Sequence, residues 1–279
     1  MKRVLPATLI LSVCFGASHA GAQALRENAE QARSILNAGV ENNDPLVRVE
    51  AINAIGMIGE HELVLTRLEQ LLQDKDIRVR LAAVHALADL ASPHSVEPLR
   101  QVLEDENVPE VVFATAKALE KLHDPAGTKA LMEIYEGKRK SSSNMIQKRK
   151  RQTTDQFHSV PSGLMYMVSL GVGYVPVRGV GEGFAAFAEL VRDKGLSDRA
   201  GVILIVGQSK DAETTDLLRN ALQDKDWSVR AAAAQMIALT ARVELRDDLL
   251  PLFSDKNRKV QFRAAGAFLH LALIQYPQQ

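Results

Sequence analysis

The sequence predicts an all-α protein built as an α-solenoid, a row of short helical hairpins that pack side by side. Similar segments recur about every 32 residues, and the apolar residues within each copy follow helical spacing. A hairpin of this length cannot bury a core alone, so neighbouring copies must share one. A glycine-containing apolar insert near the middle of the chain does not repeat and interrupts the row.

Composition excludes several other classes of protein. The 279 residues include 34 Lys and Arg, 34 Asp and Glu, and 46% hydrophobic residues. This apolar content argues against intrinsic disorder, and zero formal net charge removes bulk attraction to DNA or RNA. Nucleic acid is therefore not an expected partner. The single cysteine excludes an intrachain disulfide and a CxxC site.

Residues 1–22 have the layout of a secretory signal peptide. A basic start precedes about 12 mostly apolar residues, and Ala20 and Ala22 form a small-residue pair suited to cleavage. The apolar stretch is too short to span about 30 Å of hydrocarbon. We expect an exported chain, periplasmic or secreted. A lipoprotein signal at Cys14 is a weaker alternative, because Val13 is larger than the small residue usual before a lipidated cysteine.

The repeat is clearest in two stretches of nine residues. Residues 72–80 read LQDKDIRVR and residues 222–230 read LQDKDWSVR, so seven positions are identical. An alanine-rich run follows each stretch, and weaker copies occur elsewhere. The leading valines of the copies are Val47, Val79, Val111, Val229 and Val260.

Each copy predicts a pair of helices. The second helix places apolar residues at i, i+4, i+7, i+8 and i+11, as in Val79, Ala83, Ala86, Leu87 and Leu90. Its alanines allow close helix packing and favour helix. The first helix is marked by leucines, as in Leu63, Leu65, Leu68, Leu71 and Leu72. The expected N-caps of the second helices are Asp44, Asp76 and Asp226.

The pattern Asp-x-x-Val-Arg-x-x-Ala-x-x-Ala-Leu resembles HEAT repeats, especially the short bacterial kind related to the HEAT-like repeats of phycobilisome lyases. The resemblance covers residues 43–136 and 212–274. It implies the solenoid fold and says little about function, because HEAT arrays serve scaffolds, adaptors and a few enzymes alike.

The resemblance also implies a structural ladder between repeated arginines and aspartates. Arg48, Arg80 and Arg230 match the repeated arginine of the family. Val112 and Gln261 occupy the same position in two other copies, so the ladder is expected to break there.

Residues 137–183 depart from the repeat. Their basic residues are candidates for contact with an acidic partner or an anionic membrane surface, or they form a solvated face: Lys138, Arg139, Lys140, Lys148, Arg149, Lys150 and Arg151. We interpret 162–173 as a buried helix and 173–183 as a turn into a helix at 184–192. Whether 157–183 is buried or touches a membrane stays open.

No catalytic or metal-binding motif is apparent. The dipeptide His61-Glu62 lacks a second histidine at helical spacing, and 32 residues further on the chain has Pro93 and His94. The mature chain also has no cysteine nucleophile. We therefore expect no enzyme activity, cofactor or metal. A phycobilin-lyase-like enzyme is a remote alternative, because nothing specifies a bilin pocket.

One surface pattern suggests a binding site. On the second helices, the residue two positions after the leading valine is apolar in all five copies and points away from the alanine stripe. It serves either packing between repeats or a partner-binding ridge. The candidate partner-binding residues are Val49, Leu81, His85, Phe113, Lys117 and Phe262.

These observations divide the chain into a signal peptide (1–22), HEAT-like repeats (23–136), the insert (137–183) and further HEAT-like repeats (184–279). We predict a non-catalytic scaffold or adaptor for protein–protein interaction in the cell envelope or exported space. The alternative is a peripheral membrane-associated protein that uses residues 138–183.

Overall fold

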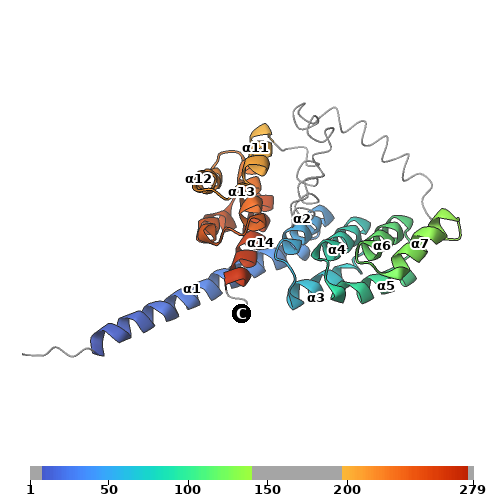
Figure 1. Cartoon of the computed structure of the whole chain (residues 1–279), viewed down its shortest axis with the longest axis horizontal. Coiled ribbons are helices and arrows are strands. Elements are labelled where there is room, and N and C mark those ends of the chain that lie inside the picture. Colours follow the sequence, from blue (N-terminus) through green and yellow to red (C-terminus); the bar gives the residue numbers. More distant parts are fainter. Residues whose placement is uncertain (1–7, 140–196, 276–279) are drawn as a thin grey trace, which may run out of the picture.

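The computed structural model describes residues 8–139 and 197–275, with side chains from residue 21 onward. Within these ranges every regular element is helical, which confirms the predicted all-α solenoid (Figure 1). The N-terminal elements are α1 (Thr8–Val40), α2 (Pro45–Gly56), α3 (Glu62–Leu71), α4 (Ile77–Leu90), η1 (Pro93–Ser95), α5 (Val96–Asp105), α6 (Pro109–Lys121) and α7 (Pro125–Tyr135). The C-terminal elements are α11 (Asp198–Val206), α12 (Ala212–Ala221), α13 (Trp227–Leu239), η3 (Val243–Leu245), η4 (Asp247–Ser254) and α14 (Arg258–Gln275).

The predicted helix starts are confirmed by their caps. The carboxylates of Asp44, Asp76 and Asp226 each accept a hydrogen bond, 2.9 Å long, from the backbone N–H two residues further on. Each bond satisfies a donor that the first turn of a helix leaves without an intrahelical partner. Aspartate therefore sets the start of α2, α4 and α13.

The hairpins pack their second helices into an inner row and their first helices outside it. Val79, Ala83 and Leu87 of α4 are fully buried, as the apolar pattern predicts. The first helix of the same repeat differs from expectation. The difference is confined to one position: Leu63 is 62% exposed and Val64 is buried, whereas Leu65, Leu68, Leu71 and Leu72 are buried as predicted.

The order of the repeats in space differs from their order in the sequence. Helix α14, the last of the chain, packs against both α1 and α2, so the C-terminal repeats precede the N-terminal ones in the row. The inner row therefore reads α11, α13, α14, α2, α4 and α6, with α7 against α6 (Figure 1). The two blocks of repeats form one continuous array, and α7 and α11 lie at its opposite ends.

Close contacts hold the junction between α14 and the N-terminal hairpin. A Cβ atom added at Gly266 would lie 2.4 Å from the backbone oxygen of Ala54, so the two helices touch backbone to backbone. The Nζ atom of Lys259 lies 3.2 Å from a carboxylate oxygen of Glu50. The Nδ1 atom of His270 lies 2.9 Å from the carbonyl oxygen of Ile58, a residue 212 positions away in the sequence.

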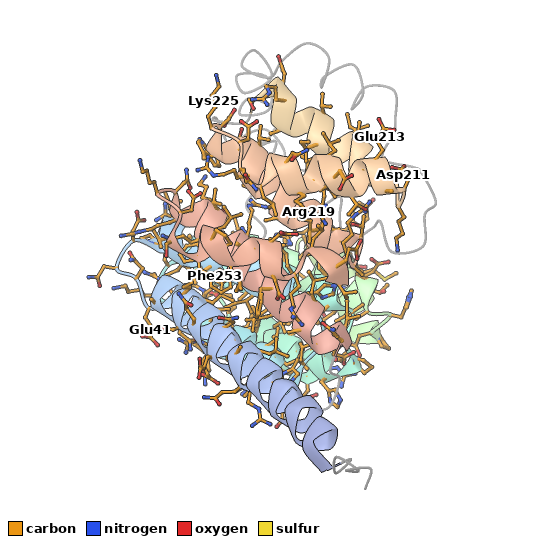
Figure 2. The ribbon with its side chains drawn as sticks, turned by 90° about the vertical axis from the view of Figure 1, so that its left-hand side faces the viewer. Glu41, Asp211, Glu213, Arg219, Lys225 and Phe253 are labelled. Carbon is orange, nitrogen blue, oxygen red and sulfur yellow. The ribbon has the colours of Figure 1, made fainter. Side chains whose placement is uncertain are left out.

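The last hairpin departs from regular α-helix in its first segment. Element η4 is a 3₁₀ helix with Pro251 inside it. Its Phe253, labelled in Figure 2, is buried and meets Phe268 of α14 edge to face, with ring centroids 5.6 Å apart. Aromatic packing of this geometry adds to the burial of both rings, so η4 fills the place of an outer helix.

Helix α1 combines an extension with an outer helix of the row. Its first part projects from the body of the molecule (Figure 1). Among its side chains described from residue 21 onward, Leu25 is the first that is buried. From Leu25 to Val40 it packs on α2 and α14. No helix among the described residues is both long and apolar enough to cross a membrane. The predicted insert helix at 162–173 lies outside the described residues.

Candidate partner-binding surface

The repeated arginines form the structural ladder that the resemblance implied. Each guanidinium donates to a carbonyl in the loop before its own helix and pairs with an acid in the loop before the next inner helix. The acids are Asp74 for Arg48 (2.8 Å), Glu106 for Arg80 (2.7 Å) and Asp255 for Arg230 (2.7 Å). The ladder thus joins consecutive repeats and fixes the loops between them.

The predicted breaks in the ladder differ from each other. Val112 is buried and has no polar group to contribute, so the ladder ends at that repeat as expected. Gln261 keeps part of it, because its Nε2 atom donates to the carbonyl oxygen of Asp255 over 2.6 Å. The amide of Gln261 therefore takes over the hydrogen bond to the loop before α14, but it cannot form an ion pair.

Two acids of the ladder, Glu106 and Asp255, are held in their charged form. Burial acts to raise the pKa of Glu106, but hydrogen bonds from the Val108 amide and from Arg80 outweigh it, so the pKa lies below its ordinary value. Burial likewise opposes a lowering of the pKa of Asp255, and the bond from Arg230 prevails. Both carboxylates are therefore ionised at neutral pH.

The structure brings three of the predicted apolar residues to one surface. Val49 of α2, Leu81 of α4 and Phe113 of α6 are half-buried, and these helices are consecutive in the inner row. His85 and Lys117, one helical turn further on, are exposed. We call these five residues the α2–α4–α6 ridge. Val49 and Leu81 also pack against the core, so the packing interpretation holds for these two residues, and partner binding stays a prediction.

Phe262 does not belong to this surface, and the prediction for it was wrong. It is 5% exposed, and its ring would lie 2.8 Å from a Cβ atom placed on Gly39. The ring is covered because α1 crosses α14 at this point. The corresponding residue of α13, Ala231, is also fully buried. The exposed ridge is therefore confined to the N-terminal repeats.

Charged pairs lie on the same helices as the ridge. Lys121 of α6 binds Asp89 of α4 over 2.8 Å, across the boundary between two repeats. Arg78 donates to Asp76 through Nε (2.9 Å) and Nη2 (2.8 Å), and these bonds lower the pKa of Asp76 to about 2. Such pairing fixes the charge pattern at the start of α4 and between α4 and α6.

The predicted basic cluster is mostly beyond the described residues. Lys138 pairs with Glu136 over 2.7 Å and is 71% exposed. Arg139 donates to the carbonyl oxygen of Leu103 over 2.8 Å and pairs with Glu133, so it ties the end of α7 to the end of α5. Its contacts are structural. The remaining members, Lys140, Lys148, Arg149, Lys150 and Arg151, lie outside the described residues, and their role stays a prediction.

A cleft that the sequence did not indicate lies where the two halves of the row meet. It has a volume of about 390 Å³ and is lined by α1, α3 and the ends of α2 and α14. No local pattern reveals it, because α1 and α14 are at opposite ends of the chain. Leu63, which the sequence pattern assigns to the apolar face of α3, is exposed at the edge of this cleft.

His61 has a structural role in the same region. Its Nδ1 atom accepts the backbone N–H of Leu63 over 3.3 Å and caps α3. Across residues 8–139 and 197–275, no group of three or more His, Cys, Asp or Glu residues is arranged to hold a metal ion.

Comparison with known families agrees with the geometry. A family model of HEAT repeats matches residues 64–142 and 185–268, which together exceed half of the 279 residues. No curated protein matches the sequence. The likeness to the bacterial repeats of phycobilisome lyases stays a prediction.

Proposed function

The chain belongs to the HEAT-repeat family, whose repeats typically mediate protein–protein interaction, and from this premise we propose that it is a non-catalytic scaffold or adaptor of the exported space. One observation carries the proposal: Val49, Leu81 and Phe113 are half-exposed on three consecutive helices. The residues at the same position of the C-terminal repeats, Ala231 and Phe262, are buried. The apolar position is thus left uncovered in one block of repeats only.

The ridge has the physical character of a protein interface. Its apolar side chains are preordered by the helices that carry them, so binding loses little side-chain entropy. His85 and Lys117 place polar groups beside the apolar anchors, which is the usual arrangement of core and rim. Neighbouring inner helices lie about 8–10 Å apart. A partner helix laid across them would need an apolar residue about every five to seven positions, since each residue rises about 1.5 Å.

Photo-crosslinking tests the proposal directly. A benzoylphenylalanine residue at Lys117 should capture a defined partner in cells, and one at the remote, exposed Lys225 should not. The substitutions Leu81→Asp and Phe113→Asp together should reduce that capture at least about tenfold, because each buries a charge in the interface. The matched control is Leu217→Asp, which changes a 37% exposed leucine on α12. Unchanged capture by a double variant with native circular dichroism would reject the ridge.

The packing of α1 supports the proposed export. Among the side chains described from residue 21 onward, Leu25 is the first that is buried, so cleavage after Ala20 or Ala22 would leave the described packed part of α1 intact. Terminal sequencing of the purified native protein should find a start at residue 21 or 23, in a periplasmic or secreted fraction. A native chain that retains residue 1 would overturn this part of the proposal.

A further inference from the structure

We propose that the cleft between α1 and α3 binds a fatty acid, with the acyl chain inside and the carboxylate at the arginine-bearing end. This site is separate from the α2–α4–α6 ridge and does not depend on the proposed partner. Its volume of about 390 Å³ lies within the range of small-molecule sites. Its walls come from both halves of the row, with Leu36 and Ile55 from the N-terminal half and Leu269 from α14.

The lining changes from apolar to polar along α1. Helices α1 and α14 run antiparallel, because Phe262 meets Gly39 while the later residues of α14 lie toward the start of α1. The early part of α1 contributes Leu25 and Ala29 to the cleft, beside Leu273 of α14. The face of α1 from Leu25 to Glu41 is about 24 Å long, at about 1.5 Å for each residue.

The opposite end of the cleft holds a guanidinium with an unused donor. Arg67 of α3 donates to Glu41 of α1 and to Gln70, both over 3.0 Å, but its Nε–H is buried without a partner. Glu41 points to solvent and is 71% exposed (Figure 2). A buried donor without a partner destabilises the free protein and favours a ligand that brings an acceptor. A carboxylate brings such an acceptor to this end.

The charges of the lining also favour an anion. Arg33 of α1 lines the cleft together with Arg67, whereas Glu41 is the one carboxylate in the lining. Glu30, the partner of Arg33, is 72% exposed and does not line the cleft. Besides His61, which caps α3, the ionisable lining carries two guanidinium groups against one carboxylate, and it complements a single negative head group.

An acyl chain suits the apolar end better than an extended peptide does. A peptide would bring backbone N–H and C=O groups among Leu25, Ala29 and Leu273, none of which can form a hydrogen bond through its side chain. Methylene groups bring no such requirement. Their transfer from water supplies the affinity, and the carboxylate fixes the direction of entry.

Calorimetric titration of the full mature chain tests the proposal. Octanoate, decanoate and dodecanoate, each below its micelle concentration, should bind at one site with affinity that rises about tenfold for every two methylene groups. Methyl dodecanoate, which lacks the charge, should bind at least about tenfold more weakly than dodecanoate. Absence of saturable dodecanoate binding, or affinity that does not depend on chain length, would overturn the proposal.

Two variants address the two ends of the site. Arg67→Met should weaken dodecanoate about tenfold, and Ala29→Phe, which fills the apolar end without changing a charge, should abolish binding. The matched control is Arg219→Met on α12, where the arginine likewise pairs across to the next outer element through Asp248, and it should bind as the wild type does. Thermal unfolding verifies that each variant is folded.

Two further measurements distinguish a fatty acid from a membrane surface or a peptide as the ligand of the cleft. Vesicles of anionic phospholipid should not compete with dodecanoate, because the cleft takes a free chain. A photo-crosslinker at Leu63 should capture added dodecanoate analogue and no protein. Binding to vesicles without binding to free carboxylates, or capture of a protein at Leu63, would assign the cleft to a bilayer or a peptide and reject the fatty acid.

Discussion

The junction between α14 and α2 depends on the absence of a side chain at Gly266. A methyl group there would lie 2.4 Å from the carbonyl oxygen of Ala54 and 3.1 Å from its carbonyl carbon. Side-chain carbons do not approach a backbone oxygen that closely, and the carbonyl of a helix cannot rotate away. The substitution Gly266→Ala must therefore separate the two helices by roughly 1 Å, which forfeits a quarter to a half of the dispersion attraction across the gap.

The expected loss of stability follows from two opposing effects. Alanine favours a helix over glycine by about 1 kcal/mol, which alone would stabilise the variant. Overpacking against a rigid neighbour loses about 1–3 kcal/mol, and the upper part applies because the neighbour is backbone. The free energy of unfolding should fall by about 1–2 kcal/mol, and the Tm of a chain of this size by about 2–8 °C.

Urea unfolding followed by circular dichroism measures this change, with Gly56→Ala as the matched control. A methyl group at Gly56 would meet the Cβ atom of Ala86 at 3.5 Å, an ordinary contact. The control variant should be as stable as the wild type or up to about 1 kcal/mol more stable. If Gly266→Ala behaved like the control, α14 would not pack on α2, and the inferred order of the repeats would be refuted.

Three further variants or conditions test the ladder and the caps. Arg80→Met should lower the free energy of unfolding by about 2–3 kcal/mol in urea titration, because it leaves Glu106 without its charged partner; a change near zero would contradict the ladder. Asp226→Ala should lose about 1 kcal/mol through the missing cap of α13, whereas Asp216→Ala, which removes a 72% exposed carboxylate, should be almost neutral. The folded-state pKa of Asp76, about 2, lies below its ordinary 3.8, so its stabilisation is complete above about pH 4 and is lost as pH falls toward 2. Thermal scans from pH 7 to pH 2 should show a constant Tm down to about pH 5 and then a fall, and a Tm that rose on acidification would contradict the reasoning.

The hairpins could be predicted because their determinants are local. Asp76 caps α4 through an amide two residues away, and the apolar face of α4 lies within a few turns of one helix. One half of each step in the ladder is local as well, because Arg80 donates a hydrogen bond to the carbonyl oxygen of Asp74, six residues earlier. Such interactions recur at a fixed spacing, so a single sequence that contains the repeat several times displays them directly.

The spatial order of the repeats could not be predicted in the same way. Every inner helix has a similar small, apolar face, so the pattern does not indicate which two helices become neighbours. The misplaced residue Phe262 follows from this, because its register matches Leu81 but α1 covers it. Two glycines in the sequence mark where helices that are distant in the chain come into contact. Gly39 and Gly266 interrupt helical patterns at the points where a second helix approaches closely.

The same permuted order constrains how the chain can fold. The faces of α1 and α2 that receive α14 stay uncovered until the last helix has been made, and contacts such as that between His270 and Ile58 span 212 positions. Contacts of this separation are formed late, because the entropy of closing the intervening chain must be lost first. A chain that folded from its N-terminus during synthesis would expose this apolar junction to aggregation.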